Sequence, residues 1–164
     1  MKNSDRMTRG AAISAAVELR LPAAALSLVR GIPLPAPLDI FFGTAEEFYL
    51  SPAEAQVSLG APTLVPLWDD GNFDTITAIH LPTKSIRCFS AGSETPPDKA
   101  PTLSYQQALV QPFVRMWESE LVDDKFDEIA RLFDFKFSEE IRVSYAEAER
   151  DHDNWLAGLM HAAA

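Results

Sequence analysis

The distribution of proline constrains this chain more than any other feature of its sequence. All 12 prolines lie between residues 22 and 112, and residues 113–164 contain none. Proline lacks the backbone N–H donor that helices and central strands use, so a long stretch without it favours helices. We therefore predict short elements joined by turns in the first part of the chain, and a helical C-terminal part.

Residues 64–90 predict a small antiparallel sheet. Three runs of strand-forming residues follow one another, at Leu64–Trp68, Phe73–Leu81 and Ser85–Ser90. Turn residues separate them, and three strands joined by tight turns form a meander. Pro66 cannot donate to a sheet ladder, so we expect the first strand to be an edge strand or to contain a bulge.

The rest of the N-terminal part predicts short elements. Helices are expected at 13–19 and 22–30, the second opening with proline and ending before glycine. Short apolar runs predict strands at 38–42 and 48–50. The spacing Ser51-Pro52-Ala53-Glu54 is typical of a capping box and predicts a helix of about two turns.

The C-terminal part predicts three helices. A capping box at Ser104 opens the first, which we expect Pro112 to kink or divide; apolar spacing over 126–137 predicts the second, and Ser144 opens the third. The expected fold class is α+β, with an antiparallel or mixed sheet flanked by helices and a C-terminal helical extension. We expect a single domain over residues 1–164, with a core at about 13–120 and the extension at 121–164.

The charge of the chain limits its partners. The sequence contains 24 acidic and 14 basic residues, a formal net charge of −10. Such an excess repels phosphate backbones and anionic lipid, so we expect neither nucleic-acid nor membrane binding. The single cysteine fits a reducing compartment, and no stretch reaches the ~18 apolar residues of a membrane span. We therefore expect a cytoplasmic protein.

Few residues point to catalysis or to metal binding. Asp70, Asn72 and Asp74 alternate as in a calcium-binding EF-hand loop, but Thr75 stands where that loop needs its glycine. We interpret the segment as a structural or partner-facing turn and expect no metal and no cofactor. His80, Cys88 and Asp74 are the residues that a small enzyme of unrecognised type would have to use. The absence of familiar catalytic motifs favours a protein that is not an enzyme, without catalytic residues.

Two segments resemble the SUKH superfamily. Leu21–Leu26 resembles the helix near the N-terminus of these domains, and Leu64–Asp74 is similar to their central strand followed by an acidic or glycine-containing turn. The hairpin and the helix from Ser104 to Trp117 follow in the expected order, so the resemblance covers roughly residues 13–118. A proline connector replaces the usual glycine-rich stretch after the first helices, and the extension from residue 121 is not covered.

The resemblance implies an α+β fold and a role in binding rather than catalysis. Many bacterial members are immunity proteins, which neutralise toxins that are often nucleases. An acidic protein suits this role, because a nuclease needs a basic cleft to attract phosphate. We therefore expect an immunity protein whose partner is a protein such as a basic toxin domain. The predicted partner-binding residues are Glu46, Glu47, Trp68, Asp69, Asp70 and Asp74.

Two alternatives remain at this point. The acidic residues of the C-terminal helices form a second candidate surface. An acidic secretion chaperone is the second candidate function, since such chaperones are also small, acidic and α+β.

Overall fold

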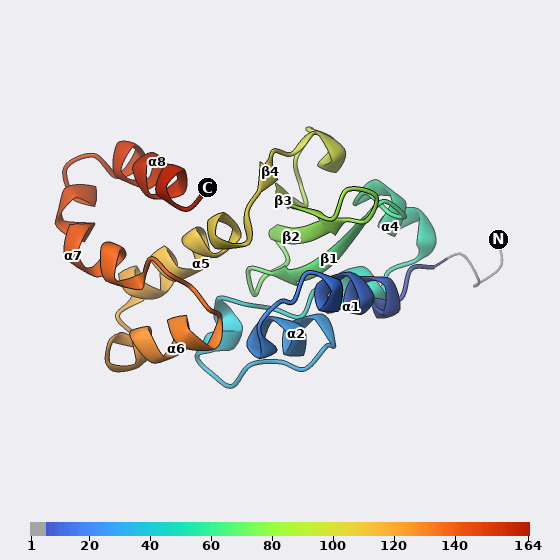
Figure 1. The fold of residues 1–164 in the computed structure, drawn as a ribbon. Coiled ribbons are helices and arrows are strands. Elements are labelled where there is room, and N and C mark those ends of the chain that lie inside the picture. Colours follow the sequence, from blue (N-terminus) through green and yellow to red (C-terminus); the bar gives the residue numbers. More distant parts are fainter. Residues whose placement is uncertain (1–5) are drawn as a thin grey trace. The chain divides into compact units, whose positions relative to one another are not determined.

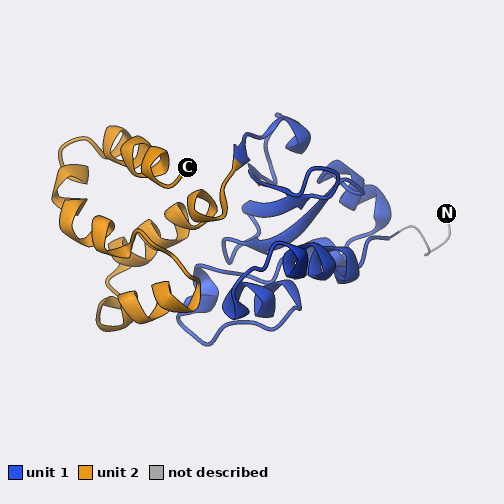
Figure 2. Cartoon of the chain, in the orientation of Figure 1, with its two compact units in different colours: residues 1–102 blue, residues 103–164 orange. Residues whose placement is uncertain are grey.

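The computed structural model describes residues 6–164, and the chain divides into two compact units (Figure 2). Unit 1 is Met1–Thr102 and unit 2 is Leu103–Ala164. The α+β fold class is confirmed, because unit 1 contains the sheet and unit 2 is helical (Figure 1). The boundary lies earlier than the extension predicted from residue 121, since the helix that follows Ser104 belongs to unit 2. Whether the whole chain acts as a single domain stays a prediction.

The predicted meander is confirmed. The sheet has the order β1-β2-β3-β4 and consists of β1 (Leu64–Asp69), β2 (Thr75–His80), β3 (Ser85–Ser90) and the short β4 (Thr102–Leu103). Strand β1 pairs antiparallel with β2, and β2 with β3. The expected irregularity at proline is also present: β1 is at the edge of the sheet, and its register with β2 shifts between Pro66 and Trp68.

Helices cover the sheet of unit 1. The two predicted N-terminal helices are confirmed as α1 (Arg9–Glu18) and α2 (Ala23–Val29), which pack on β1. The buried residues of α1 are all alanines, whose small side chains allow close approach to the neighbouring elements. A core cluster joins the three long strands to the segment before β4, and its members are Leu64, Ile76, Ala78, Phe89 and Ala100.

The strands predicted at 38–42 and 48–50 are wrong. Leu38–Ile40 forms the 3₁₀ helix η2, which follows a turn in which the Leu38 N–H donates to the Pro35 carbonyl. Glu46–Leu50 forms helix α3, whose first turn carries two glutamates that complement the positive end of the helix dipole. Apolar runs of three to five residues are too short for their period to separate a strand from a helix.

The helix predicted after Ser51 is confirmed as α4 (Ala53–Ser58), but its predicted cap is wrong. Pro52 is the N-cap residue, and the Ser51 hydroxyl donates to the Glu47 carbonyl at 2.6 Å. The remaining element of unit 1 is the 3₁₀ helix η3 (Pro97–Lys99).

Unit 2 consists of helices that pack around aromatic side chains. Its elements are α5 (Tyr105–Ser119), the 3₁₀ helix η4 (Asp123–Lys125), α6 (Phe126–Leu132), α7 (Ser138–Ala148) and α8 (His152–Ala162). The capping box at Ser104 is confirmed, and α5 continues through Pro112 without dividing. Phe113 lies at the centre, stacked on Phe135 with 4.3 Å between ring centroids.

The third predicted C-terminal helix is wrong in its bounds. Ser144 lies inside α7 and donates to the Glu140 carbonyl, one turn earlier. The next helix, α8, begins after Asp151, whose side chain caps the Asn154 N–H. No helix within residues 6–164 has the length and apolar character needed to cross a membrane.

Candidate functional site

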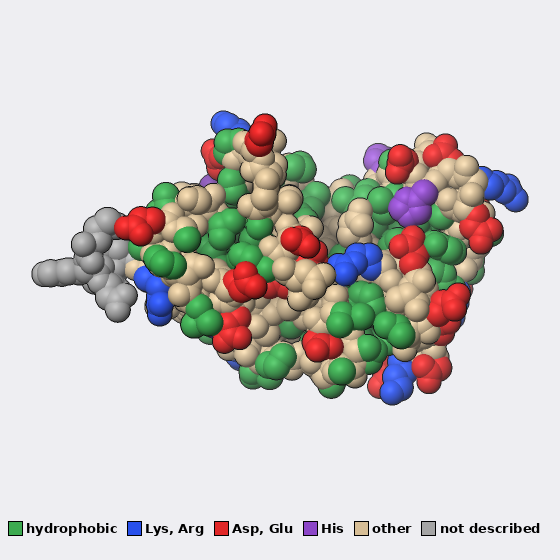
Figure 3. Space-filling view, turned by 180° about the vertical axis from the view of Figure 1, so that it is seen from behind, with side chains coloured by type: hydrophobic (Ala, Val, Ile, Leu, Met, Phe, Trp, Pro, Cys, Tyr) green, Lys and Arg blue, Asp and Glu red, His purple; other side chains and the backbone are tan. Residues whose placement is uncertain are grey.

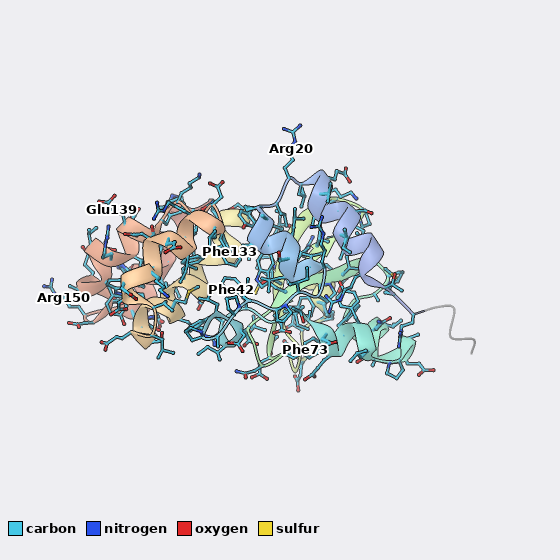
Figure 4. All side chains as sticks on the ribbon, turned by 90° about the horizontal axis from the view of Figure 1, so that it is seen from below. Arg20, Phe42, Phe73, Phe133, Glu139 and Arg150 are labelled. Atoms are coloured by element: carbon cyan, nitrogen blue, oxygen red, sulfur yellow. The ribbon has the colours of Figure 1, made fainter. Side chains whose placement is uncertain are left out.

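Unit 1 contains an open hollow of about 520 Å³ whose lining is rich in carboxylates. We call it the acidic hollow, and it is lined by Pro33, Asp39, Phe42, Gly43, Thr44, Glu46, Glu47, Asp69, Gly71, Asn72 and Phe73. Three parts of the chain meet there: the connector after α2, the start of α3 and the β1–β2 turn. Phe42 and Phe73, labelled in Figure 4, contribute the aromatic part of the lining.

Asp69 holds these segments together. Its side chain is buried, and each carboxylate oxygen accepts a backbone N–H: Oδ2 from Ala45 at 3.0 Å and Oδ1 from Gly71 at 2.7 Å. The backbone of Asp69 also pairs with Gly43, with N–H to carbonyl distances of 3.0 and 3.1 Å. A Cβ atom on Gly43 would lie 2.0 Å from Asp69 Oδ1, so this approach requires glycine.

Arg9 of α1 also anchors residues 43–49. Its Nη1 donates to the carbonyl oxygens of Thr44 at 2.7 Å and of Val29 at 3.3 Å. The guanidinium carbon lies 4.3 Å from the centroid of the Tyr49 ring, a cation–π contact. The Tyr49 hydroxyl in turn donates to the Pro66 carbonyl at 2.6 Å. Residues 43–49 are therefore tied to α1, α2 and β1 at once.

Burial raises the pKa of the Asp69 carboxyl above its ordinary value, and the negative charges of Asp70 and Glu47 act in the same direction. The N–H donors of Gly71 and Ala45 stabilise the carboxylate, but they do not outweigh the loss of hydration. Asp69 therefore takes up a proton more readily than an ordinary carboxyl group does.

The motif that resembles a calcium loop forms a hydrogen-bonded turn. Asp70 Oδ1 accepts the N–H groups of Asn72 at 3.2 Å and of Asp74 at 3.1 Å, the pattern of an Asx turn. Gly71 takes the positive φ of 89° that this turn requires. Within residues 6–164, no three His, Cys, Asp or Glu side chains are placed to hold a metal ion.

The structure brings together most of the predicted partner-binding residues. Glu46 and Glu47 are exposed at the start of α3 and line the acidic hollow, and Asp69 lies at its wall. Asp70 and Asp74 belong to the adjoining turn, where Asp74 is exposed. Whether these residues bind a partner stays a prediction.

Trp68 was also predicted to bind a partner, but its side chain is 1% exposed and is not available to one. It packs edge to face with Phe42, with ring centroids 6.2 Å apart, and so belongs to the core.

Sequence reasoning missed Asp39, Phe42 and Arg9. Asp39 lies in a segment predicted to be a strand, and Arg9 precedes the predicted start of its helix. No local signal connects either residue to the β1–β2 turn, because the connection depends on the pairing of Gly43 with Asp69.

The three candidate catalytic residues do not form a group. His80 pairs with Ser85 and Cys88 with Thr77, so the alternation of side chains places His80 and Cys88 on opposite faces of the sheet. His80 Nδ1 lies 2.7 Å from the Thr83 hydroxyl, and Asp74 belongs to the turn at the other end of β2. Burial raises the pKa of the Cys88 thiol, which disfavours the reactive thiolate.

No protein-family model, curated protein or solved structure matches this chain.

Proposed function

We propose that this protein is a non-enzymatic binding module that uses the acidic hollow and the adjoining turn to bind a basic surface of a protein partner. The proposed role is that of an immunity protein that neutralises a toxin such as a nuclease, as the resemblance to the SUKH superfamily implies. The concentration of acidic residues around one anchored loop carries the proposal.

The distribution of charge within unit 1 supports this choice of surface. Residues 1–102 contain 11 acidic and 8 basic residues, so this unit is close to balanced. Six of the 11 acids nevertheless line the hollow or belong to the turn: Asp39, Glu46, Glu47, Asp69, Asp70 and Asp74. A local cluster of this kind in a nearly neutral unit produces a directed field, which steers a basic partner and speeds association.

The anchoring of the loop supports the proposal as well. The start of α3 is held by Asp69 and Arg9 through hydrogen bonds of 3.0 and 2.7 Å, so Glu46 and Glu47 project from a fixed backbone. A preorganised surface loses less conformational freedom on binding than a mobile loop does. The charges can therefore act on a partner without first being ordered.

The experiment compares two double variants that remove the same charge. Glu46→Gln/Glu47→Gln neutralises the first turn of α3, and Glu139→Gln/Glu140→Gln is a matched control at the first turn of α7 in unit 2. All four side chains are exposed and stand in the first turn of a helix, so the two variants lose the same small interaction with a helix dipole and should both fold. Each protein is co-expressed with a toxin-like protein encoded beside it, and survival, affinity and association rate are measured at low and high salt.

We expect the α3 variant to bind about tenfold more weakly, with a slower association and a smaller salt dependence, and the α7 variant to bind like the wild type. Equal losses in the two variants would mean that only the net charge matters. If the wild-type protein gave neither a complex nor protection, the proposed function would be wrong.

A further inference from the structure

The Thr44–Ala45 peptide group in the wall of the acidic hollow forms hydrogen bonds with a cationic side chain on one side and an anionic side chain on the other. The Thr44 carbonyl accepts Arg9 Nη1 at 2.7 Å, and the N–H of the same peptide, that of Ala45, donates to Asp69 Oδ2 at 3.0 Å. A cation on the oxygen and an anion on the N–H both polarise the peptide in the same sense, so the two hydrogen bonds strengthen each other. The orientation of this peptide therefore depends on the charge of Asp69.

Ala45 is strained in this orientation. Its φ is 51°, in the left-handed region where the Cβ of an L-residue approaches the neighbouring carbonyl. The residue stays there because the surrounding hydrogen bonds hold it. Rotating the Thr44–Ala45 peptide plane by about half a turn would bring φ of Ala45 to a negative value, outside the left-handed region.

Protonation of Asp69 removes one of the two charges that hold the strained orientation. A neutral carboxyl group carries an O–H donor on one of its oxygens and has lost its negative charge, so that oxygen is a much weaker acceptor for an N–H group. The bond from Gly71 is the local one, two residues along the chain, and it keeps its acceptor Oδ1. A proton on Oδ2 would then face the Ala45 N–H, a donor against a donor. Rotation of the peptide would present the Thr44 carbonyl to that O–H; Arg9 would lose its bond to Thr44 and keep the one to Val29.

Charged side chains of the neighbouring elements lie around Asp69. They are Arg9 of α1 on the far side of the peptide, Asp39 of η2, Glu46 and Glu47 of α3, and Asp70 of the turn. Asp70 and Glu47 raise the pKa of Asp69, in addition to the effect of its burial. Asp69 therefore protonates at a higher pH than an isolated carboxyl would.

We propose that the Thr44–Ala45 peptide is a proton-controlled switch: ionised Asp69 holds the Ala45 N–H in the observed orientation, and protonated Asp69 releases the peptide, which rotates so that the Thr44 carbonyl accepts the carboxyl O–H. The proposed switch operates in the free protein and requires no bound partner. Its consequence for partner binding, a weaker hold on a basic surface at lower pH, rests on the proposed function.

Nuclear magnetic resonance of the free protein tests the switch during a pH titration. The readouts are the Asp69 side-chain carboxyl carbon, the Ala45 amide group, and the nuclear Overhauser effect between Thr44 Hα and the Ala45 amide proton. That effect depends on ψ of Thr44 and changes only if the peptide rotates. We expect all three to change together, at a pH above the midpoints of exposed carboxyl groups.

Three variants distinguish rotation of the peptide from titration of Asp69 alone. Asp69→Asn should abolish the transition, and Asp70→Asn, the neighbouring control, should retain it. Ala45→Gly relieves the left-handed strain and favours the observed orientation, so it should lower the midpoint by about one pH unit or less. An unchanged Overhauser effect while the Asp69 carboxyl titrates would overturn the proposal, as would an unshifted midpoint in Ala45→Gly. Because no partner is present, a failed search for a toxin leaves this result standing.

Discussion

The close approach of Gly43 to Asp69 leads to a prediction for the substitution Gly43→Ala. The added Cβ would lie 2.0 Å from Oδ1, 2.7 Å from Cγ and 3.0 Å from Oδ2 of Asp69. Gly43 does not have a positive φ, so alanine can adopt its backbone conformation without strain. The cost of the substitution therefore comes from the carboxylate that must move.

The size of this effect follows from the geometry. An unstrained carbon–oxygen contact is about 3.3 Å, so Oδ1 must withdraw by about 1.3 Å. Hydrogen bonds of 2.7 and 3.0 Å do not survive such a displacement, and each bond to a charged group contributes about 1.5–3 kcal/mol. Replacing glycine by alanine returns up to about 1 kcal/mol through the unfolded state. We expect Gly43→Ala to lower the free energy of unfolding by at least about 2 kcal/mol.

Urea denaturation followed by tryptophan fluorescence measures this loss. A shared Trp117→Phe/Trp155→Phe background leaves Trp68 of unit 1 as the reporter. Gly92→Ala is the matched control, because no atom outside its two chain neighbours lies within 4 Å of the added Cβ, and it should change stability by less than about 0.5 kcal/mol. In an Asp69→Ala background the clashing atoms are gone, so adding Gly43→Ala should then cost little. Equal stabilities of the Gly43→Ala and Gly92→Ala proteins would refute the reasoning.

Three further predictions concern single groups. Tyr49→Phe removes the hydroxyl that donates to the buried Pro66 carbonyl, and should lower the free energy of unfolding by about 1–3 kcal/mol in the same urea assay. Gly158 lies inside α8, and apart from its chain neighbours and the backbone of its own helix no atom lies within 4 Å of the Cβ that alanine would add. Gly158→Ala should therefore stabilise unit 2 by about 0.5–1 kcal/mol, measured by urea denaturation with Trp117 and Trp155 retained; a loss of stability would contradict the prediction. Because the pKa of Asp69 is raised in the folded state, folding opposes its ionisation. The stability of the wild type relative to Asp69→Asn should therefore be greatest at low pH and fall as pH rises through the folded-state pKa; urea titrations at several pH values that gave the opposite slope would contradict it.

Elements with strong local signals were predictable from the sequence. The meander follows from three strand-forming runs with turn residues between them, and the start of α5 follows from the capping box at Ser104. The break between α7 and α8 was not predictable in the same way. Ser144 has the residue pattern of a cap, yet a serine inside a helix can bond to the carbonyl one turn earlier, as it does here with Glu140.

The candidate site was predictable only in part. Glu46, Glu47 and Asp69 were selected for their charge, and they meet in one hollow because Gly43 pairs with Asp69 across 26 residues of chain. No local pattern encodes that contact. Trp68 was grouped with the acids of the turn that follows it, but every residue of β1 is buried.

The location of the net charge matters more for function than its size. Unit 2 carries 13 acids against 6 bases and is therefore the more acidic part, and acidic side chains (red) lie over much of the face shown in Figure 3. Many acids of unit 2 stand in the first turns of helices, at Asp127 and Glu128 of α6, Glu139 and Glu140 of α7, and Asp153 of α8. Acids at these positions stabilise the helix dipole and keep the surface soluble, which explains them without a partner. Glu46 and Glu47 also stand in the first turn of a helix, but in unit 1 Asp69 is in addition buried at a cost in hydration and holds the backbone that presents them. The less charged unit therefore carries the stronger case for a binding surface.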